Sequence, residues 1–199
     1  MINENIVFLS GNKSKREEFS QMIEGLECVV PIKDIPEIES KDEILVTAYK
    51  LKDMLNSIKL DFSTIYFIED TSLQIENADI GTDIKHVLDK LSKFGGRAAK
   101  WIVTLAVSNG VKIDFYQGKI EGSLTSKPFG ENGFGFDQYF IPDKQLKEGT
   151  NLTLAEISKN EKYKYSARFN AVQNFNKRNV FKTINISDLE DWHGNYQED

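Results

Sequence analysis

The sequence has few of the residues and patterns that several classes of protein require. Cys28 is the only cysteine among 199 residues, which excludes an internal disulfide and a zinc site built from thiolates. The two histidines, His86 and His193, lie in an amphipathic segment and in an acidic tail, so a Ser/His/Asp or Cys/His nucleophile is not expected. Charged residues interrupt every hydrophobic run before it reaches the length of a membrane span.

The net charge of the chain argues against nucleic acid as a partner. The chain carries 25 basic and 31 acidic side chains, a formal net charge of -6. This balance argues against sequence-independent binding of nucleic acid, which needs a broad basic face. A small anion remains compatible, because a few cations and a bound metal hold one on an acidic protein. The N-terminal residues lack the apolar run of a signal peptide, so we expect a cytoplasmic protein.

Hydrophobic patterns predict alternating strands and helices. Short runs rich in apolar or branched residues predict strands at 5–9, 28–32, 64–70, 101–107 and 112–124, the last two joined by a hairpin turn. Apolar residues at helical spacing predict helices within 13–23, 42–58, 84–91 and 158–176. We expect an α/β fold with a mixed sheet, one domain over residues 1–180, and an acidic, frayed tail over 181–199.

The turn after the first strand is a candidate anion site. A strand that enters a helix through the glycine turn at 10–12 presents free backbone N–H groups and the positive end of the helix dipole. Lys13, Lys15 and Arg16 lie in the first helical turn, where cations are mildly unfavourable, so a bound anion would explain their placement. The alternative is a solvated basic turn.

Carboxylates follow the third predicted strand. Glu69 and Asp70 close the run 64–70, and carboxylates at such a sheet edge suit Mg²⁺, which prefers hard oxygen ligands and shares them with phosphates. Side chains alternate along a strand, so only one of the two is expected to contact a metal directly. Glu37 is a further carboxylate. The alternative for Glu69 and Asp70 is a polar strand end that meets solvent, and the alternative for Glu37 is an ordinary acidic residue of a loop.

Two later segments suit a nucleotide base. Glycines around Phe134 and Phe136 let the backbone approach a flat ligand, and either ring is suited to stack on a base. The alternative is a flexible loop in which Asp137 caps a turn. Lys162 and Arg168 suit phosphate and base-edge recognition, against the alternative of a solvated helix face.

Helix geometry constrains this last pair. In one unbroken helix, residues six apart project about 120° from each other, so Lys162 and Arg168 would not both face one nucleotide. We therefore expect the helical path to break before Ser166, which would cap a new helix carrying Arg168.

The order of these segments resembles the inosine triphosphate pyrophosphatase family. The matching series is SGNKSK after the first strand, PE at 36–37, EDTSL at 69–73, GFGFD at 133–137, TLAE at 153–156 and K-x-x-x-S-x-R at 162–168. The resemblance covers about residues 5–175. It implies a homodimer of two-lobed α/β proteins, each with an elongated mixed sheet, flanking helices and a central cleft.

The resemblance also implies roles for the matching residues. Asp70 is implied as a Mg²⁺ ligand and as the carboxylate that activates water, and Glu37 as the second metal ligand. With the arguments above, the candidates for binding the nucleotide are Ser10, Gly11, Asn12, Lys13, Lys15, Thr71, Lys85, Phe134, Gly135, Phe136, Asp137, Lys162, Ser166, Ala167 and Arg168.

The sequence departs from the family pattern at two places, and both affect the expected recognition of the purine base. Members usually read Ser-His-Arg where this chain has Ser166-Ala167-Arg168. Members also carry a loop rich in Gly and Pro-Gly after EDTSL, where this chain reads QIENADIGTDIKHVL and Lys85 takes the place of a substrate lysine found in some members. We expect ITP, dITP or XTP to be preferred over ATP, but less sharply than is usual in the family.

The sequence thus predicts Mg²⁺-dependent hydrolysis of a purine nucleoside triphosphate to the monophosphate and pyrophosphate. Two alternatives remain open. One is a non-catalytic nucleotide-binding protein on the same fold, and the other is a pyrophosphatase for a modified or pyrimidine triphosphate.

Overall fold

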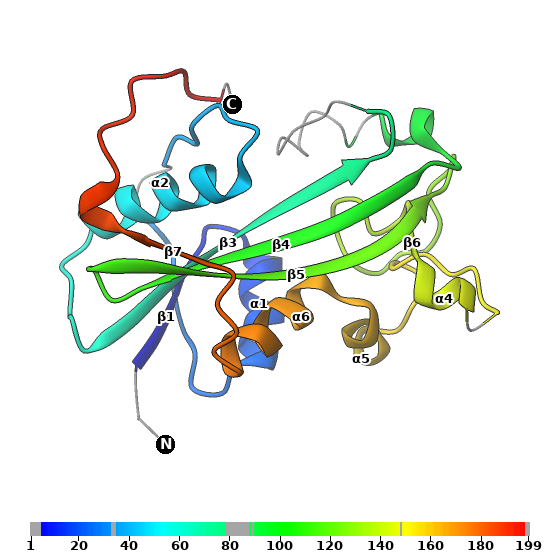
Figure 1. Cartoon of the computed structure of the whole chain (residues 1–199). Helices are drawn as coiled ribbons and strands as arrows, with labels where there is room; N and C mark the ends of the chain where they lie inside the picture. Colours follow the sequence, from blue (N-terminus) through cyan, green and yellow to red (C-terminus); the bar gives the residue numbers. More distant parts are fainter. Residues whose placement is uncertain (1–4, 33–34, 79–87, 89, 148, 198–199) are drawn as a thin grey trace. The chain divides into compact units, whose positions relative to one another are not determined.

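The computed structural model describes residues 5–32, 35–78, 88, 90–147 and 149–197 and contains a seven-stranded mixed sheet (Figure 1). Its strands are β1 (Asn5–Leu9), β2 (Glu27–Val29), β3 (Thr64–Ile75), β4 (Ala98–Ser108), β5 (Lys112–Leu124), β6 (Phe140–Pro142) and β7 (Lys182–Asn185). Their order is β2-β1-β3-β4-β5-β6, and β7 pairs with β5. β1 is parallel to β2 and β3, whereas β5 is antiparallel to β6 and β7. The predicted α/β class with a mixed sheet is confirmed.

Helices flank this sheet. They are α1 (Lys13–Met22), α2 (Glu43–Asn56), α4 (Asp143–Lys147), α5 (Lys159–Lys162) and α6 (Ala167–Asn176), with 3-10 turns η1 (Leu91–Phe94), η2 (Tyr163–Tyr165) and η3 (Ile186–Asp188). Most of the helix predicted over 84–91 lies outside the described residues. Within the described part of the chain, no helix has the length and apolar character needed to cross a membrane.

The chain divides into two compact units. Unit 1 contains Met1–Asp70, Thr104–Gln117 and Val172–Asp199, and unit 2 contains Thr71–Val103 and Gly118–Ala171. β3, β4, β5 and α6 therefore each contribute residues to both units. The candidate site residues divide in the same way, with Ser10 through Asp70 in unit 1 and Thr71 through Arg168 in unit 2.

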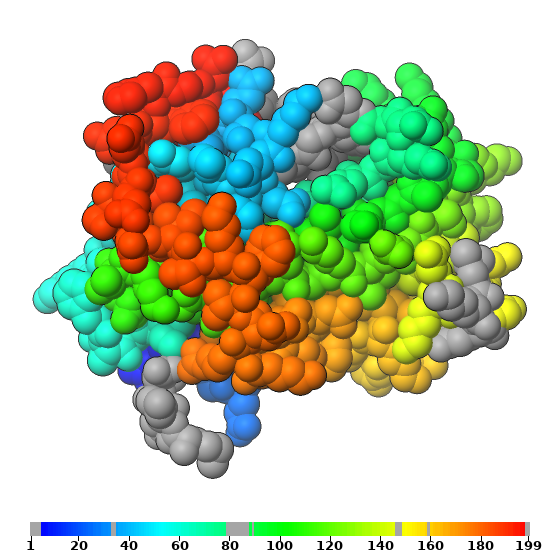
Figure 2. Space-filling model, in the orientation of Figure 1, coloured from blue at the N-terminus to red at the C-terminus, as the bar shows by residue number. Residues whose placement is uncertain are grey.

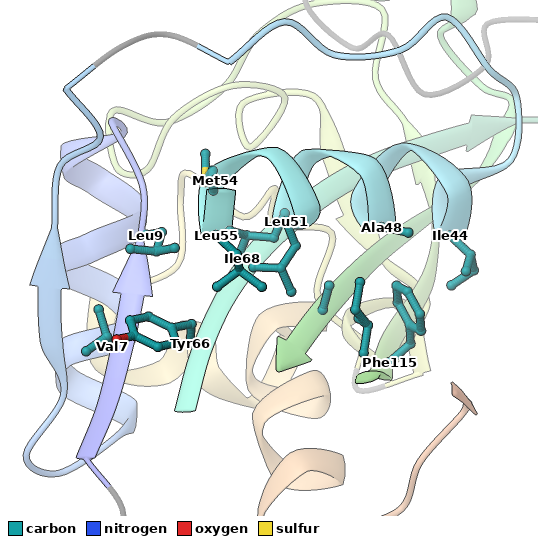
Figure 3. Packing of buried hydrophobic residues seen from close by; sticks show 12 residues of the cluster. Val7, Leu9, Ile44, Ala48, Leu51, Met54, Leu55, Tyr66, Ile68 and Phe115 are labelled. Atoms are coloured by element: carbon teal, nitrogen blue, oxygen red, sulfur yellow. The ribbon is translucent and has the colours of Figure 1, made fainter. Parts of the chain in front are cut away.

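Helix α2 covers one face of the strands in unit 1. Asp42 starts the helix because its carboxylate accepts hydrogen bonds from the backbone N–H groups of Ile44 (2.9 Å) and Leu45 (3.2 Å). Apolar residues of α2 then pack onto β1, β3 and β5 (Figure 3). The buried core on this face contains Val7, Leu9, Ile44, Ala48, Leu51, Met54, Leu55, Tyr66, Ile68, Ala106, Ile113 and Phe115.

The opposite face of β1 and β3 packs against α1. Phe8 stacks on Phe67 with ring centroids 4.7 Å apart, and Phe19 of α1 contacts both rings. Successive side chains of a strand alternate between the faces. Glu69 therefore lies on the α1 face with Phe67, and Asp70 on the α2 face.

Strand β3 is longer than the sequence pattern predicted. It continues past Asp70 to Ile75, so Asp70 lies within the strand and is not at its exposed end. Leu73 and Ile75 are buried at 2% and 5% exposure with the exposed Gln74 between them, which is the alternation expected of a strand. Two acidic residues at 69–70 interrupt the apolar run in the sequence without interrupting the hydrogen-bonded strand.

The acidic C-terminal tail is also structured, so the prediction of a frayed tail is wrong. β7 pairs with β5 from Lys112↔Asn185 to Phe115↔Lys182. The chain beyond η3, here called the C-terminal segment (residues 189–197), lies against the light-blue stretch that contains α2 and the residues before it (Figure 2). Leu189 and Trp192 supply apolar surface that a count of charges overlooks.

Candidate active site

The turn at 10–12 is held in a defined shape by its own side chains. Asn12 caps α1, and its side-chain oxygen accepts a hydrogen bond from the backbone N–H of Lys15 at 3.1 Å. The Ser10 hydroxyl accepts from the Asn12 N–H at 3.2 Å, and the Arg16 guanidinium donates to the Ser10 carbonyl at 2.7 Å. Arg16 is thus a structural support of the turn. Gly11 is exposed, and a Cβ placed there would meet no atom within 4 Å.

Two lysines of this helical turn have different surroundings. The Lys13 side chain is 83% exposed and lies 3.8 Å from Glu17, an arrangement that contributes little to stability. Lys15 instead forms an ion pair with Glu69, whose side chain is fully buried. Lys13 is therefore accessible to an anion, whereas Lys15 brings a fixed positive charge to β3.

Asp70 lies in a group of charges on the α2 face of β3. Lys50 of α2 forms an ion pair with Glu37, and both contribute to the electrostatic surroundings of Asp70. Burial raises the pKa of the Asp70 carboxyl to about 7, although Lys50 and Lys15 act in the opposite direction. Glu37 and Glu69 raise this pKa further. Asp70 is therefore a carboxylate that exchanges a proton near neutral pH.

The same carboxylates determine the pKa of Lys50. Burial alone lowers the pKa of this ammonium, but the charges of Glu37 and Asp70 outweigh burial and raise it. Lys50 thus stays protonated beside Glu37. Lys15 and Glu69, paired on the other face of β3, also act on Asp70, so the charges around this part of the strand are three carboxylates and two ammonium groups, with a net charge of −1 when all are ionised.

The carboxylates of this group suit Mg²⁺ only if substrate phosphates supply further ligands. In the described residues, no three His, Cys, Asp or Glu side chains form a group that would hold a metal ion by themselves. Mg²⁺ does not require such a cage, because it is commonly held by one or two carboxylates together with substrate phosphates. Glu37 and Asp70 match that smaller set.

Unit 2 contains a buried arginine between aromatic rings. The Arg168 guanidinium lies 4.9 Å from the ring centroid of Phe134 and 5.4 Å from that of Trp101. It also donates a hydrogen bond to the Thr71 hydroxyl at 3.1 Å. The side-chain Nε1–H of Trp101 is buried without a hydrogen-bond partner in the described part of the chain. These two cation–π contacts and the hydrogen bond to Thr71 hold the guanidinium in place.

The loop before β6 is held by Asp137. Its carboxylate accepts hydrogen bonds from the Phe134 N–H at 2.8 Å and from the Lys162 ammonium at 2.7 Å. Gly133 must be glycine, because its φ is +85° and a Cβ would lie 2.1 Å from the Asp137 carboxylate. Asp137 is thus a turn cap and also the partner of the buried Lys162, which joins the glycine-rich loop at 133–137 to the segment that begins at Lys162.

The two phenylalanines of this loop differ in accessibility. Phe136 is 5% exposed and packs edge-on against Trp101 at 5.6 Å, as a core residue does. Phe134 is half-buried and lies beside both Lys162 and Arg168. Of the two predicted stacking rings, Phe134 is the one with exposed surface. Gly135, between them, is exposed with φ +65°.

The predicted helix break is confirmed. α5 ends at Lys162, η2 follows, and Ser166 is extended with φ −105° and ψ 122° before α6 begins at Ala167. The Ser166 hydroxyl accepts a hydrogen bond from the Phe169 N–H at 3.3 Å, as a capping residue does. Ala167 is fully buried, and a Cβ on Gly118 of β5 would lie 2.0 Å from the Ala167 carbonyl oxygen. The start of α6 therefore lies directly on β5.

Sequence reasoning missed Lys50 and Trp101, and Lys85 lies outside the described residues. A signal for Lys50 was present, because Glu43, Thr47 and Lys50 recur at helical spacing and form a polar stripe on α2. The sequence held no such signal for Trp101, because a tryptophan in an apolar strand is expected to lie in the hydrophobic core.

Known proteins are similar to this chain in both sequence and fold. A dITP/XTP pyrophosphatase of Korarchaeum cryptofilum is 32% identical over 180 residues, covering 82% of this chain and 89% of that protein. An inosine triphosphate pyrophosphatase 2 of Trypanosoma cruzi is 29% identical over 184 residues, 85% of this chain and 89% of that protein. The structure of a HAM1 protein from Coxiella burnetii, 22% identical, matches with a TM-score of 0.69 over 87% of this chain and 97% of that one.

The resemblance seen in the sequence motifs is thus confirmed by relatives along most of the chain. A second solved structure, the Ham1 protein of Staphylococcus aureus, matches with a TM-score of 0.66 at 21% identity over 87% of this chain and 97% of that one. The model of the Ham1 family matches residues 6–178, and the chain belongs to this family.

Proposed function

We propose that this protein is a Mg²⁺-dependent pyrophosphatase that hydrolyses ITP, dITP and XTP to the monophosphate and pyrophosphate, clearing them from the nucleotide pool. The observation that carries the proposal is Asp70, a half-buried carboxyl with a pKa raised by burial to about 7 beside Glu37 and two lysines. The names of the relatives as dITP/XTP and inosine triphosphate pyrophosphatases support the choice of substrate.

The triphosphate is proposed to bind at the N-terminus of α1. Exposed Gly11 leaves the backbone open to a phosphate, and the helix dipole favours an anion there. Lys13 has a free path to solvent, and Lys15 lies behind it in an ion pair with Glu69. These charges would neutralise the pyrophosphate as it leaves, which is the stage at which stabilisation accelerates the reaction.

Glu37 and Asp70 would hold Mg²⁺ together with the substrate phosphates. When bound, the ion polarises the phosphate and lowers the pKa of the attacking water. The Asp70 carboxylate would accept the proton of that water. Lys50 holds the Glu37 carboxylate in place.

Arg168 is proposed to recognise the purine. A guanidinium offers only donors, which suit the 6-keto oxygen of hypoxanthine or xanthine and do not suit the exocyclic amine of adenine. Thr71 and Phe134, its neighbours, would contact the nucleotide, with Phe134 stacking on the base. Lys162, paired with Asp137, would bring a further positive charge to the substrate. A cytoplasmic homodimer is proposed from the family resemblance alone.

One assay tests this function against its alternatives. A panel of NTPs and dNTPs is incubated with Mg²⁺, and monophosphate, pyrophosphate and orthophosphate are measured. We expect monophosphate and pyrophosphate from ITP, dITP and XTP, and slower turnover of ATP. Orthophosphate with a diphosphate as first products would overturn the mechanism. Binding of ITP without turnover would identify a non-catalytic nucleotide-binding protein, and preference for a pyrimidine would overturn the role of Arg168.

A further inference from the structure

The chain continues beyond the family match, which ends at residue 178. We propose that the C-terminal segment (residues 189–197) positions Glu37 for metal binding. This inference rests on the proposed role of Glu37 as a ligand of Mg²⁺. All residues involved belong to unit 1.

The C-terminal segment is anchored to α2. The Lys52 ammonium donates hydrogen bonds to the Leu189 carbonyl at 2.7 Å and to the Glu190 carbonyl at 3.3 Å. The Trp192 ring meets the edge of Tyr49 with centroids 5.5 Å apart. Both anchors come from one turn of α2, next to Lys50, so the segment crosses the helix close to the partner of Glu37.

The segment then folds back on itself. The Trp192 indole donates a hydrogen bond to the Asn195 carbonyl at 2.9 Å. Gly194 lies against the same indole so closely that a Cβ there would come within 2.5 Å of a ring carbon. This turn directs the last residues towards the stretch 37–39.

Backbone pairing joins the segment to Glu37 and its neighbours. The Gln197 N–H donates to the Glu37 carbonyl at 2.8 Å, and the Glu39 N–H donates to the Asn195 carbonyl at 2.9 Å. Ile38 and Tyr196 form the antiparallel bridge between these bonds. Within the described part of the chain, both backbone-to-backbone hydrogen bonds of 37–39 go to the C-terminal segment.

Side-chain packing adds to this pairing. Ile38 is 1% exposed and belongs to a cluster with Val46 and Tyr49, which Trp192 covers. The adjacent Glu37 carboxylate meets Lys50. The stretch 37–39 is thus held between α2 and the C-terminal segment, and the backbone of Glu37 is fixed before any metal binds. Groups that orient a ligand in this way commonly affect metal affinity about 10- to 100-fold.

The test uses two variants and a matched control. The first variant ends at Asp188, which keeps β7 and η3, and the second is Trp192→Ala in the full chain, in case the shorter chain fails to fold. His193→Ala is the control, because His193 is an exposed residue of the same segment. The readouts are amide exchange at Glu39, Mn²⁺ affinity without nucleotide, and the Mg²⁺ dependence of turnover.

We expect faster exchange of the Glu39 amide in both variants and a rise of about tenfold or more in the Mn²⁺ dissociation constant and in the half-saturating Mg²⁺ concentration. At saturating Mg²⁺, kcat should stay within about threefold of wild type, because the bound ion restores the position of Glu37. If the C-terminal segment only stabilised the fold, the two variants would change kcat and the metal requirement together. His193→Ala should match wild type throughout.

The Glu37→Gln variant distinguishes a failure of the positioning role from a failure of the proposed ligand role of Glu37. Unchanged exchange at Glu39 in both variants would show that the segment does not hold 37–39. Faster exchange with wild-type Mn²⁺ affinity, while Glu37→Gln weakens that affinity, would overturn the positioning role and leave the proposed function intact. Unchanged Mn²⁺ affinity in Glu37→Gln would instead overturn the ligand role of Glu37, and this inference with it.

Discussion

Asp70 and Glu69 are adjacent in the chain, yet different lysines on different faces of β3 surround them. Glu69 is fully buried and paired with Lys15, so its charge is already balanced. Asp70 shares Lys50 with Glu37, which leaves an excess of negative charge on its side of the strand. A divalent cation and a proton both relieve that excess, which is why Asp70 is the candidate for catalysis and Glu69 is not.

We predict that Asp70→Asn abolishes turnover and leaves the fold intact. The amide has nearly the same shape as the carboxyl but neither holds Mg²⁺ well nor accepts a proton from water. Loss of such a group typically lowers the rate at least about a hundredfold. Steady-state assays with ITP and circular dichroism give the comparison, with the exposed Asp61→Asn as control. Near-normal activity in Asp70→Asn would place the metal site elsewhere.

The raised pKa of Asp70 also predicts how stability depends on pH. Because burial raises this pKa to about 7, the folded protein holds a proton that the unfolded chain releases between about pH 4 and pH 7. Asp70 therefore lowers stability progressively as the pH rises through that window. In EDTA, Asp70→Asn should be more stable than wild type by about 1–2 kcal/mol at pH 8, allowing for solvent screening, and equal to it near pH 4.

Urea unfolding at several pH values measures this difference. Asp61 provides a control of opposite sign, because hydrogen bonds from the Ser63 backbone and side chain lower the pKa of its carboxyl. Asp61→Asn should therefore lose stability at neutral pH and lose less as the pH falls. A difference between wild type and Asp70→Asn that does not vary with pH would contradict the raised pKa.

At the scale of elements, local pattern predicted most of the fold. The runs at 5–9, 42–58 and 112–124 contain enough apolar residues at a single period to identify β1, α2 and β5. The extension of β3 was not predictable in this way, since Glu69 and Asp70 break the apolar run and the lysine charges that act on them come from other elements. Charge partners are set by tertiary structure, which no local window contains.

The break between α5 and α6 carries its own prediction. Ser166→Ala removes the hydroxyl that accepts from the Phe169 N–H at the start of α6. We expect a loss of about 1 kcal/mol in the free energy of unfolding. Ser158→Ala is the matched control, because that hydroxyl bonds to the Glu161 carboxylate instead of a backbone N–H, and it should change stability by less than about 0.5 kcal/mol. Equal losses in denaturant unfolding would contradict the capping role.

At the scale of the whole molecule, motif order identified the family although each motif was ambiguous alone. The order of the segments matched the family, and the family match over residues 6–178 together with a relative along most of the chain confirms the membership. The ordered C-terminal segment was not predicted, because it lies beyond the family match and its acidic composition resembles a disordered tail. Its order depends on Tyr49 and Ile38, which are distant in sequence.

The candidate residues divide between the two compact units, and the last prediction follows from this division. Lys13 belongs to unit 1 and is proposed to meet phosphate, which every triphosphate carries. Lys13→Ala should therefore lower kcat/KM for ITP and ATP by one common factor, about three- to tenfold. Arg168 belongs to unit 2 and is proposed to meet the base. Arg168→Lys keeps the charge but loses the planar donors, so the ratio of kcat/KM for ITP to that for ATP should fall about threefold to a hundredfold.

The double variant tests whether Lys13 and Arg168 act independently. Lys13 pairs with Glu17, whereas Arg168 contacts Thr71 and Phe134, and the effects of residues with different partners usually add as free energies. The loss of kcat/KM in the double variant should then equal the product of the two single losses, within about twofold. The wild type should prefer ITP, but less sharply than relatives that carry histidine at the position of Ala167. If Lys13→Ala shifts the ITP/ATP ratio as strongly as Arg168→Lys does, phosphate and base recognition do not divide between these residues.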